Sequence, residues 1–298
     1  MPAVTSLLIV GAGVAVAAFT ARGEKRRRTA IMRAVAERRH GTLEPGGWFG
    51  NPLLEITHGD GIEIRVSMWS TKHGRFTEYN AIIPAPGLPV CRVAPTGFTG
   101  RVGKVLGAQD IEVGLVAFDE TFVVKGDDPA VVRRLWPTAR ARDMALAFRT
   151  SRIECDASTI KLLQPVIESA EQIESGIDLV LGLARSDPFG LTVLGELPEA
   201  KLRHGDRFVQ ALLPGPSRIQ IGPVEQGGIV RTCARTAAIG PLPPDAVTSV
   251  SALGATLETS DQELTISWPS VEDDPRRLTA AAELLRRLAS GPSLGVFR

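Results

Sequence analysis

An uninterrupted run of 18 uncharged residues, at positions 4–21, constrains the fold of this chain more than any other feature of its sequence. A helix of that length extends about 27 Å, close to the thickness of the hydrocarbon core of a bilayer. Residues 22–28 then carry five basic side chains and one acidic one, and basic residues next to a span tend to stay in the cytoplasm. We therefore predict a transmembrane anchor over residues 1–21 in a bacterial inner membrane, with the body of the protein in the cytoplasm.

Two other interpretations of the same residues stay open. Gly11 and Gly13 follow an apolar run, as in the turn that holds a dinucleotide pyrophosphate, but Val16 stands where that fingerprint needs a third small residue. Ala15 and Ala17 could end a cleaved signal peptide, but signal peptides carry their basic residues before the apolar run. A transmembrane anchor explains more of these residues than the turn of a dinucleotide-binding oxidoreductase or a signal peptide would.

The basic charge of the chain is concentrated in one short run. The whole sequence has 34 basic and 33 acidic residues, so removing the five and the one of residues 22–28 leaves 29 basic and 32 acidic residues. Nucleic acid is therefore not an expected partner of the body. The run itself predicts contact with anionic lipid headgroups. The side chains expected at the membrane surface are Arg22, Lys25, Arg26, Arg27 and Arg28.

Strand-like and helix-like patterns follow each other after residue 46, which predicts an α+β fold. Asp60-Gly61 lies between two β-rich runs and predicts a hairpin. The connections between most strand-like runs are too short for crossover helices, so we expect antiparallel sheets with packed helices. The apolar spacing over residues 165–184 predicts a helix with one buried face, and residues 111–118 read as a strand.

The two halves of the body share their C-terminal patterns. The strand-like residues 152–163 resemble residues 255–268, and a shift of 105 aligns the helices that follow. This predicts an internal repeat, although helix periodicity alone can also produce such a match. We therefore expect a basic juxtamembrane helix and linker at residues 22–46, a first α+β domain at 47–185 and a smaller α+β domain at 186–298.

No pattern in the sequence predicts a catalytic, cofactor or metal site. Residues 127–129 and 273–275 both read Asp-Asp-Pro, and such paired carboxylates could bind magnesium or share a proton. Both triplets also precede helical patterns, and an acid followed by proline is typical of a helix start. One cause, helix capping, thus explains both copies.

The histidines and cysteines fit no metal-binding spacing. His58 with Asp60 could orient a general base, and His204 with Asp206 repeats the pattern, but no nucleophile motif accompanies either pair and both lie in expected turns. The three cysteines are far apart and lack a CxxC spacing, so we expect them to be buried as free thiols. They are Cys91, Cys155 and Cys233.

Residues 111–146 read IEVGLVAFDETFVVKGDDPAVVRRLWPTARARDMAL, a Phe-Asp-x-x-Phe-x-Val strand followed by a charged turn and an arginine-bearing helix. In this the chain resembles a group of uncharacterised bacterial proteins that have an N-terminal membrane segment and a cytoplasmic α+β domain of unknown function. The resemblance covers residues 1–185 and implies a membrane-anchored protein. It brings no catalytic residues with it.

The sequence thus predicts a single-pass, membrane-tethered cytoplasmic protein that binds or scaffolds without catalysis of its own. Its expected partners are the bilayer, through residues 4–21, and a protein or small ligand close to the membrane. Small residues in the span also allow a homo-oligomer. The competing class is a hydrolase-type enzyme that uses Asp127, Asp128 or the pair of His58 and Asp60. No cofactor is expected.

Overall fold

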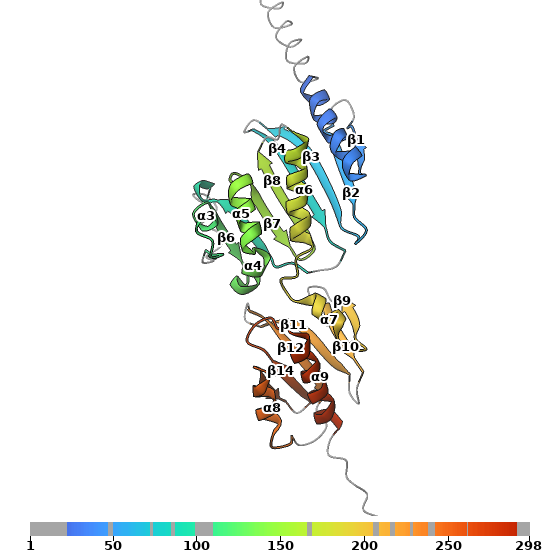
Figure 1. Cartoon of the computed structure of the whole chain (residues 1–298), viewed down its shortest axis with the longest axis vertical. Coiled ribbons are helices and arrows are strands. Elements are labelled where there is room, and N and C mark those ends of the chain that lie inside the picture. The colour runs from blue at the N-terminus through green and yellow to red at the C-terminus, as the bar shows by residue number, and fades with distance from the viewer. Residues whose placement is uncertain are drawn as a thin grey trace, which may run out of the picture. The chain divides into compact units, whose positions relative to one another are not determined.

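The strands of this protein form two antiparallel sheets on which helices pack, so the predicted α+β class is confirmed (Figure 1). The computed structural model divides into two compact units. The first unit comprises the described residues up to Ile82 and residues 150–153 and 160–184. The second unit comprises the described residues of 83–149, 154–159 and 185–298. The structure describes residues 23–46, 50–71, 74–84, 87–98, 110–165, 169–204, 209–214, 218–226, 229–237, 242–260 and 262–290.

The prediction of a single-pass membrane protein is corrected by the structure. Among the residues that the structure describes, no helix is long and apolar enough to cross a membrane. This finding overturns the predicted inner-membrane localisation and the single-pass architecture. The physical reason is visible in the first described helix, residues 23–39, which carries the basic run instead of an apolar one. The predicted span at residues 4–21, with Gly11 and Gly13, lies outside the described residues.

The first sheet contains eight strands in the order β1-β2-β3-β4-β8-β7-β5-β6. The predicted hairpin is confirmed, because β2 and β3 pair antiparallel up to Thr57 and Glu63, and Gly61 between them has φ +81°. Alternate side chains along the strands other than β1 are buried, as a sheet with one covered face requires. The strands are β1 Thr42–Glu44, β2 Leu53–Thr57, β3 Glu63–Thr71, β4 Gly74–Ile82, β5 Cys91–Pro95, β6 Phe122–Gly126, β7 Arg152–Asp156 and β8 Thr159–Pro165.

Several helices accompany this part of the chain: α3 Val116–Asp119, α4 Pro129–Leu135, α5 Thr138–Ala147 and α6 Ala170–Ala184. The helix predicted from Pro165 begins five residues later. Pro165 ends β8, and α6 begins where Ser169 and Gln172 satisfy each other's backbone N–H groups at 3.3 Å, the reciprocal arrangement of a capping box.

The strand predicted at residues 111–118 is wrong, because this segment ends in the short helix α3. The carboxylate of Asp119 accepts hydrogen bonds from the backbone N–H groups of Val113 (2.8 Å) and Gly114 (3.0 Å). Gly114 has φ +94°, a value that L-residues rarely adopt, and this turn directs the chain into a helix.

The second sheet has six strands in the order β13-β14-β12-β11-β10-β9. Three helices, α7 Leu191–Glu196, α8 Ala246–Ala252 and α9 Pro275–Ser290, belong to this part of the chain. The strands are β9 Lys201–His204, β10 Val209–Leu213, β11 Ile219–Gln226, β12 Ile229–Ala237, β13 Thr256–Thr259 and β14 Glu263–Ser267.

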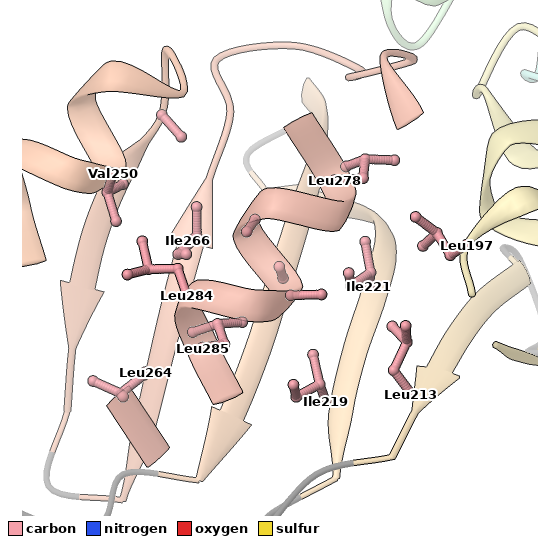
Figure 2. Close-up of a cluster of buried hydrophobic side chains, with 14 of the residues drawn as sticks. Leu197, Leu213, Ile219, Ile221, Val250, Leu264, Ile266, Leu278, Leu284 and Leu285 are labelled. Atoms are coloured by element: carbon pink, nitrogen blue, oxygen red, sulfur yellow. The ribbon is translucent and has the colours of Figure 1, made fainter. Parts of the chain in front are cut away.

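One face of the second sheet and its three helices share a single hydrophobic core (Figure 2). Apolar side chains of α9 recur at spacings of three and four, so one face of this helix is buried. Leu278 and Leu285 of that face lie over Ile221 and Ile266 of the sheet (Figure 2). All three helices therefore lie on the same face of the sheet, the one that carries these side chains.

The two segments that suggested an internal repeat adopt the same local structure. Each comprises two strands followed by a helix, β7, β8 and α6 in one case and β13, β14 and α9 in the other. The side chains aligned by the 105-residue shift are buried in both helices. They are Leu179, Val180, Leu183 and Ala184, and Leu284, Leu285, Leu288 and Ala289. A common origin of the two halves stays a prediction.

Candidate functional site

Asp128, one of the residues considered for catalysis, serves as a structural hydrogen-bond acceptor. Its Oδ1 accepts from the backbone N–H groups of Ala130 (2.8 Å) and Val131 (3.2 Å), which confirms the predicted cap of α4. Its Oδ2 accepts from the N–H of Val230 at 2.7 Å. Val230 is the second residue of β12 and is buried. The side chain of Asp128 is 4% exposed. Three backbone donors and burial together leave Asp128 unsuited to act as a general base.

The second Asp-Asp-Pro triplet is also a confirmed helix cap. Asp274 Oδ1 accepts from the N–H of Arg276 at 2.9 Å, and its carbonyl accepts from the N–H of Leu278 at the start of α9. Asp273 lies beside it and accepts from Arg134 Nη2 at 2.8 Å. The structure therefore does not bring the two carboxylates of this triplet together on a metal or a shared proton.

His58 and Asp60 lie in the turn between β2 and β3. Asp60 accepts weakly from the N–H of Ile62 (3.4 Å), and the N–H of Gly61 donates to the carbonyl of His58 (2.9 Å), as in a tight turn. Within the described residues, no group of three His, Cys, Asp or Glu side chains could hold a metal ion. Asp206, the partner expected for His204, lies outside the described residues.

The three cysteines are free and buried. Cys155 shares a hydrogen bond with the thiol of Cys91. That hydrogen bond and burial raise the pKa of Cys155, which suppresses the thiolate, so this pair is not an activated nucleophile. Cys233 lies elsewhere, on β12, with its Sγ 3.7 Å from Ser267 Oγ.

The side chains predicted to contact lipid headgroups have different environments. Lys25 is half-buried and donates to the carbonyl of Gly46 at 3.4 Å. Arg28 forms an ion pair with Glu24 at 3.2 Å. Arg26 and Arg27 are exposed, and Arg22 lies outside the described residues. Contact of these five side chains with lipid headgroups stays a prediction.

The open face of the first sheet carries several ion pairs, although Lys125, which pairs in register with Arg92, has no ion pair with a described residue. Arg65 lies 2.7 Å from Glu63 and 3.1 Å from Glu55. On the strands that follow in the sheet, Lys161 pairs with Glu78 at 3.1 Å, and Arg92 with Glu154 at 2.9 Å. Such neighbouring opposite charges on an exposed sheet are an ordinary solvated surface.

The open face of the second sheet has a different charge pattern, and we call it the arginine face. It consists of the side chains that point away from the hydrophobic core shared with α7, α8 and α9. Its charged members are four cations and two acids, a formal excess of two positive charges. They are Lys201 and Arg203 on β9, Arg231 and Arg235 on β12, Glu258 on β13 and Glu263 on β14.

Strand register places three of these charges, Lys201, Arg235 and Glu258, in one row across the sheet. Pairing runs from Lys201 to Leu212, from Leu212 to Gln220, and from Gln220 to Arg235. Beyond β12 the row continues to Thr265, which pairs with Glu258. The arginines therefore lie in the middle of the sheet, and the two acids lie towards one edge.

Small side chains form the surface between the two arginines. Cys233 lies midway between Arg231 and Arg235 on β12, and its direct cross-strand neighbours are Gly222 on β11 and Ser267 on β14. Cys233 and Ser267 are each 7% exposed. Because alternate residues of a strand share a face, each arginine has this small-residue surface on one side.

Each of the two arginines has one N–H donor that is buried and has no hydrogen-bond acceptor. The Nε atoms of Arg231 and Arg235 are buried and have no hydrogen-bond partner. Glu263 approaches Arg235 Nε to 3.7 Å, which is within ion-pair range but too long for a hydrogen bond. A buried donor without an acceptor costs roughly 1–3 kcal/mol. Because the Nε atoms are covered, a ligand meets these guanidiniums only at their exposed part, and the side chain of Arg235 is 38% exposed.

Sequence reasoning missed the arginine face, although the sequence contained a signal for it. Residues 229–237 read IVRTCARTA, a β-rich run in which Arg231, Cys233 and Arg235 recur with the period of two that places them on one face. The neighbouring strands that complete the face are distant in sequence, and only the register shows which of their residues lie beside the arginines.

No protein-family model matches this chain, and neither does any curated protein with which it was compared. A solved structure that it is similar to is the crystal structure of the mycobacterial trehalose monomycolate transport factor A. The TM-score is 0.39 at 12% sequence identity, and the match covers 53% of this chain and 93% of that one. A likeness of this size carries no functional argument.

Proposed function

We propose that this protein acts by binding a protein partner on the arginine face, without catalysis of its own. One observation carries the proposal: this face has no covering helix among the described residues, and it carries four cations against two acids. Arginine, which has an apolar stem and a planar donor group, is enriched among the residues that contribute most of the binding energy at protein interfaces.

The contrast between the two open sheet faces supports a binding role for the second one. On the first sheet, each of Arg65, Lys161 and Arg92 has a carboxylate within 3.1 Å. On the arginine face, the one ion pair between described residues is the 3.7 Å contact of Arg235 with Glu263. A solvated surface tends to pair its charges, whereas a surface that meets an anionic partner keeps cations available.

The residues considered for a hydrolase do not favour that alternative. Asp128 is committed to three backbone N–H groups, and Asp274 caps α9. His58 and Asp60 form a turn in which Asp60 accepts from a backbone N–H. The carboxylates of Asp128, Asp274 and Asp60 thus accept from backbone N–H groups, which accounts for their positions, whereas Asp127 is exposed and His58 Nε2 is buried without a hydrogen-bond partner.

Site-specific photo-crosslinking in the cells that make the protein tests the proposal. A photoreactive residue is placed at Thr265, on the arginine face, and in a matched variant at Ser67, an equally half-buried outward position of the first sheet. We expect one protein, identified by mass spectrometry, to be captured from position 265 and not from position 67. Equal capture at both positions, or capture from position 67 alone, contradicts the proposal.

A further inference from the structure

We infer that the arginine face takes an extended acidic protein segment in which two carboxylates, at positions i and i+4, pair with Arg231 and Arg235. This inference deepens the proposed function and rests on it, because it names the chemistry of the partner. It goes further in predicting a spacing, which the separation of the two arginines on β12 determines.

The spacing follows from strand geometry. Arg231 and Arg235 are four residues apart on one strand, and each residue of a strand advances the chain by about 3.3 Å, so their Cα atoms are about 13 Å apart. A segment that lies extended along β12 has the same advance per residue. Its side chains at i and i+4 share one face and reach both arginines, whereas those at i and i+3 point to opposite faces.

The residues between the arginines are small and nearly covered, since Cys233 and Ser267 are each 7% exposed. The side chain at i+2 of an extended segment faces the same way as those at i and i+4. On this chain it would lie over Cys233, Gly222 and Ser267, and not in a pocket. Val224, half-buried and paired in register with Arg231, adds apolar contact beside that arginine.

The charge of the two arginines indicates which ligand atoms fit. A guanidinium presents its donors in one plane, a geometry that matches the two oxygens of a carboxylate. The side chain of Arg235 is 38% exposed, and Arg231 is half-buried. A carboxylate at the exposed donors of each arginine neutralises its charge, whereas the neutral oxygen of a glutamine would only accept a hydrogen bond.

Nucleic acid is also anionic, but this face suits it less well than a peptide. Glu258 and Glu263 would repel a continuous phosphate backbone. Non-specific single-strand binding also relies on aromatic side chains for base stacking. The described side chains of the arginine face include no aromatic residue, and the apolar ones, Leu212 and Val224, are aliphatic.

Two synthetic peptides of identical composition test the inference on the full-length chain. Both carry two glutamates in a Val/Thr-rich background, at i and i+4 in one and at i and i+3 in the other. Fluorescence anisotropy is expected to show that the i, i+4 peptide binds about tenfold more tightly or better, equivalent to about 1.4 kcal/mol, and that added salt weakens it. Equal affinity of the two peptides, or binding of neither up to about 1 mM, overturns the inference.

Charge-removing variants locate the interaction. We expect Arg231→Gln with Arg235→Gln to lower affinity for the i, i+4 peptide at least about tenfold, with an unchanged circular dichroism spectrum. The matched control, Arg92→Gln with Lys161→Gln, removes two cations from the open face of the first sheet and is expected to bind as the unmodified chain does. Loss of binding in the control, or no loss in the arginine variant, refutes the assignment.

Other occupants have distinct signatures. An oligonucleotide of equal charge that bound more tightly than the peptide, and needed both arginines, would replace the peptide with nucleic acid. A concentration-dependent dimer that was lost in the arginine variant would assign the face to a second copy of this chain. If crosslinking from position 265 captures a partner but neither peptide binds, the proposed function stands and the acidic segment is wrong.

Discussion

Replacing Asp128 with alanine should destabilise the protein more than an ordinary cap deletion does. The side chain accepts from three backbone N–H groups, those of Ala130, Val131 and Val230, at 2.8, 3.2 and 2.7 Å. Loss of a helix cap costs about 1 kcal/mol. The Val230 N–H, which is buried, would lose its acceptor at a further cost of about 1–3 kcal/mol. We therefore expect Asp128→Ala to lower the free energy of unfolding by about 2–4 kcal/mol.

Asp274 provides the matched comparison, because its carboxylate accepts the 2.9 Å bond from Arg276 at an exposed helix start. Asp274→Ala should cost about 1 kcal/mol, and Asp128→Asn, which keeps one acceptor oxygen, should fall between the two alanine variants. Urea unfolding followed by far-UV circular dichroism measures all three. Hydrogen exchange at the Val230 amide should accelerate in Asp128→Ala alone. A cost for Asp128→Ala no larger than that for Asp274→Ala would refute this reasoning.

Three further predictions concern local packing and charge. In α6, a Cβ at Gly176 would lie 2.5 Å from Tyr79 Oη and 2.7 Å from Tyr79 Cε1, so Gly176→Ala should lower stability to urea by about 1–2 kcal/mol. In α7, a Cβ at Gly195 would meet only Leu202 Cδ1, at an ordinary contact distance of 3.8 Å, so Gly195→Ala should raise stability by up to about 1 kcal/mol. Burial raises the pKa of Tyr79, the single tyrosine, above the unfolded value of about 10. Its contribution to the free energy of unfolding is therefore present below about pH 10 and is lost as the pH rises further. Absorbance of the tyrosinate should appear only when the protein unfolds. Arg39 makes 2.8 and 2.9 Å contacts with Asp178, and since both are partly exposed, Arg39→Ala should cost less than about 1 kcal/mol and cost still less in high salt, measured by thermal unfolding.

Features that depend on neighbouring residues could be predicted from the sequence. The turn at Gly61 and the caps at Asp128 and Asp274 each need only a few adjacent residues, and the structure contains all three. The buried face of α6 follows from apolar spacing within one helix. Local hydrogen bonding and helix periodicity are sufficient in these cases.

Three other features could not be predicted in the same way. The strand pattern of residues 111–118 gave way to α3, because Asp119 binds backbone N–H groups upstream of it. The prediction of a single-pass membrane protein was wrong, since no helix among the residues that the structure describes is long and apolar enough to cross a membrane. The arginine face requires the register between β11, β12 and β14, which no local pattern encodes.

The affinity of the crosslinked partner, purified and titrated against the full-length chain, tests the central claim most directly. The account predicts that Arg231→Gln with Arg235→Gln weakens this affinity at least about tenfold, and that Arg92→Gln with Lys161→Gln leaves it unchanged. Equal affinity for both variants, with both still folded, would show that the partner binds elsewhere and would contradict the assignment of the arginine face as the binding surface.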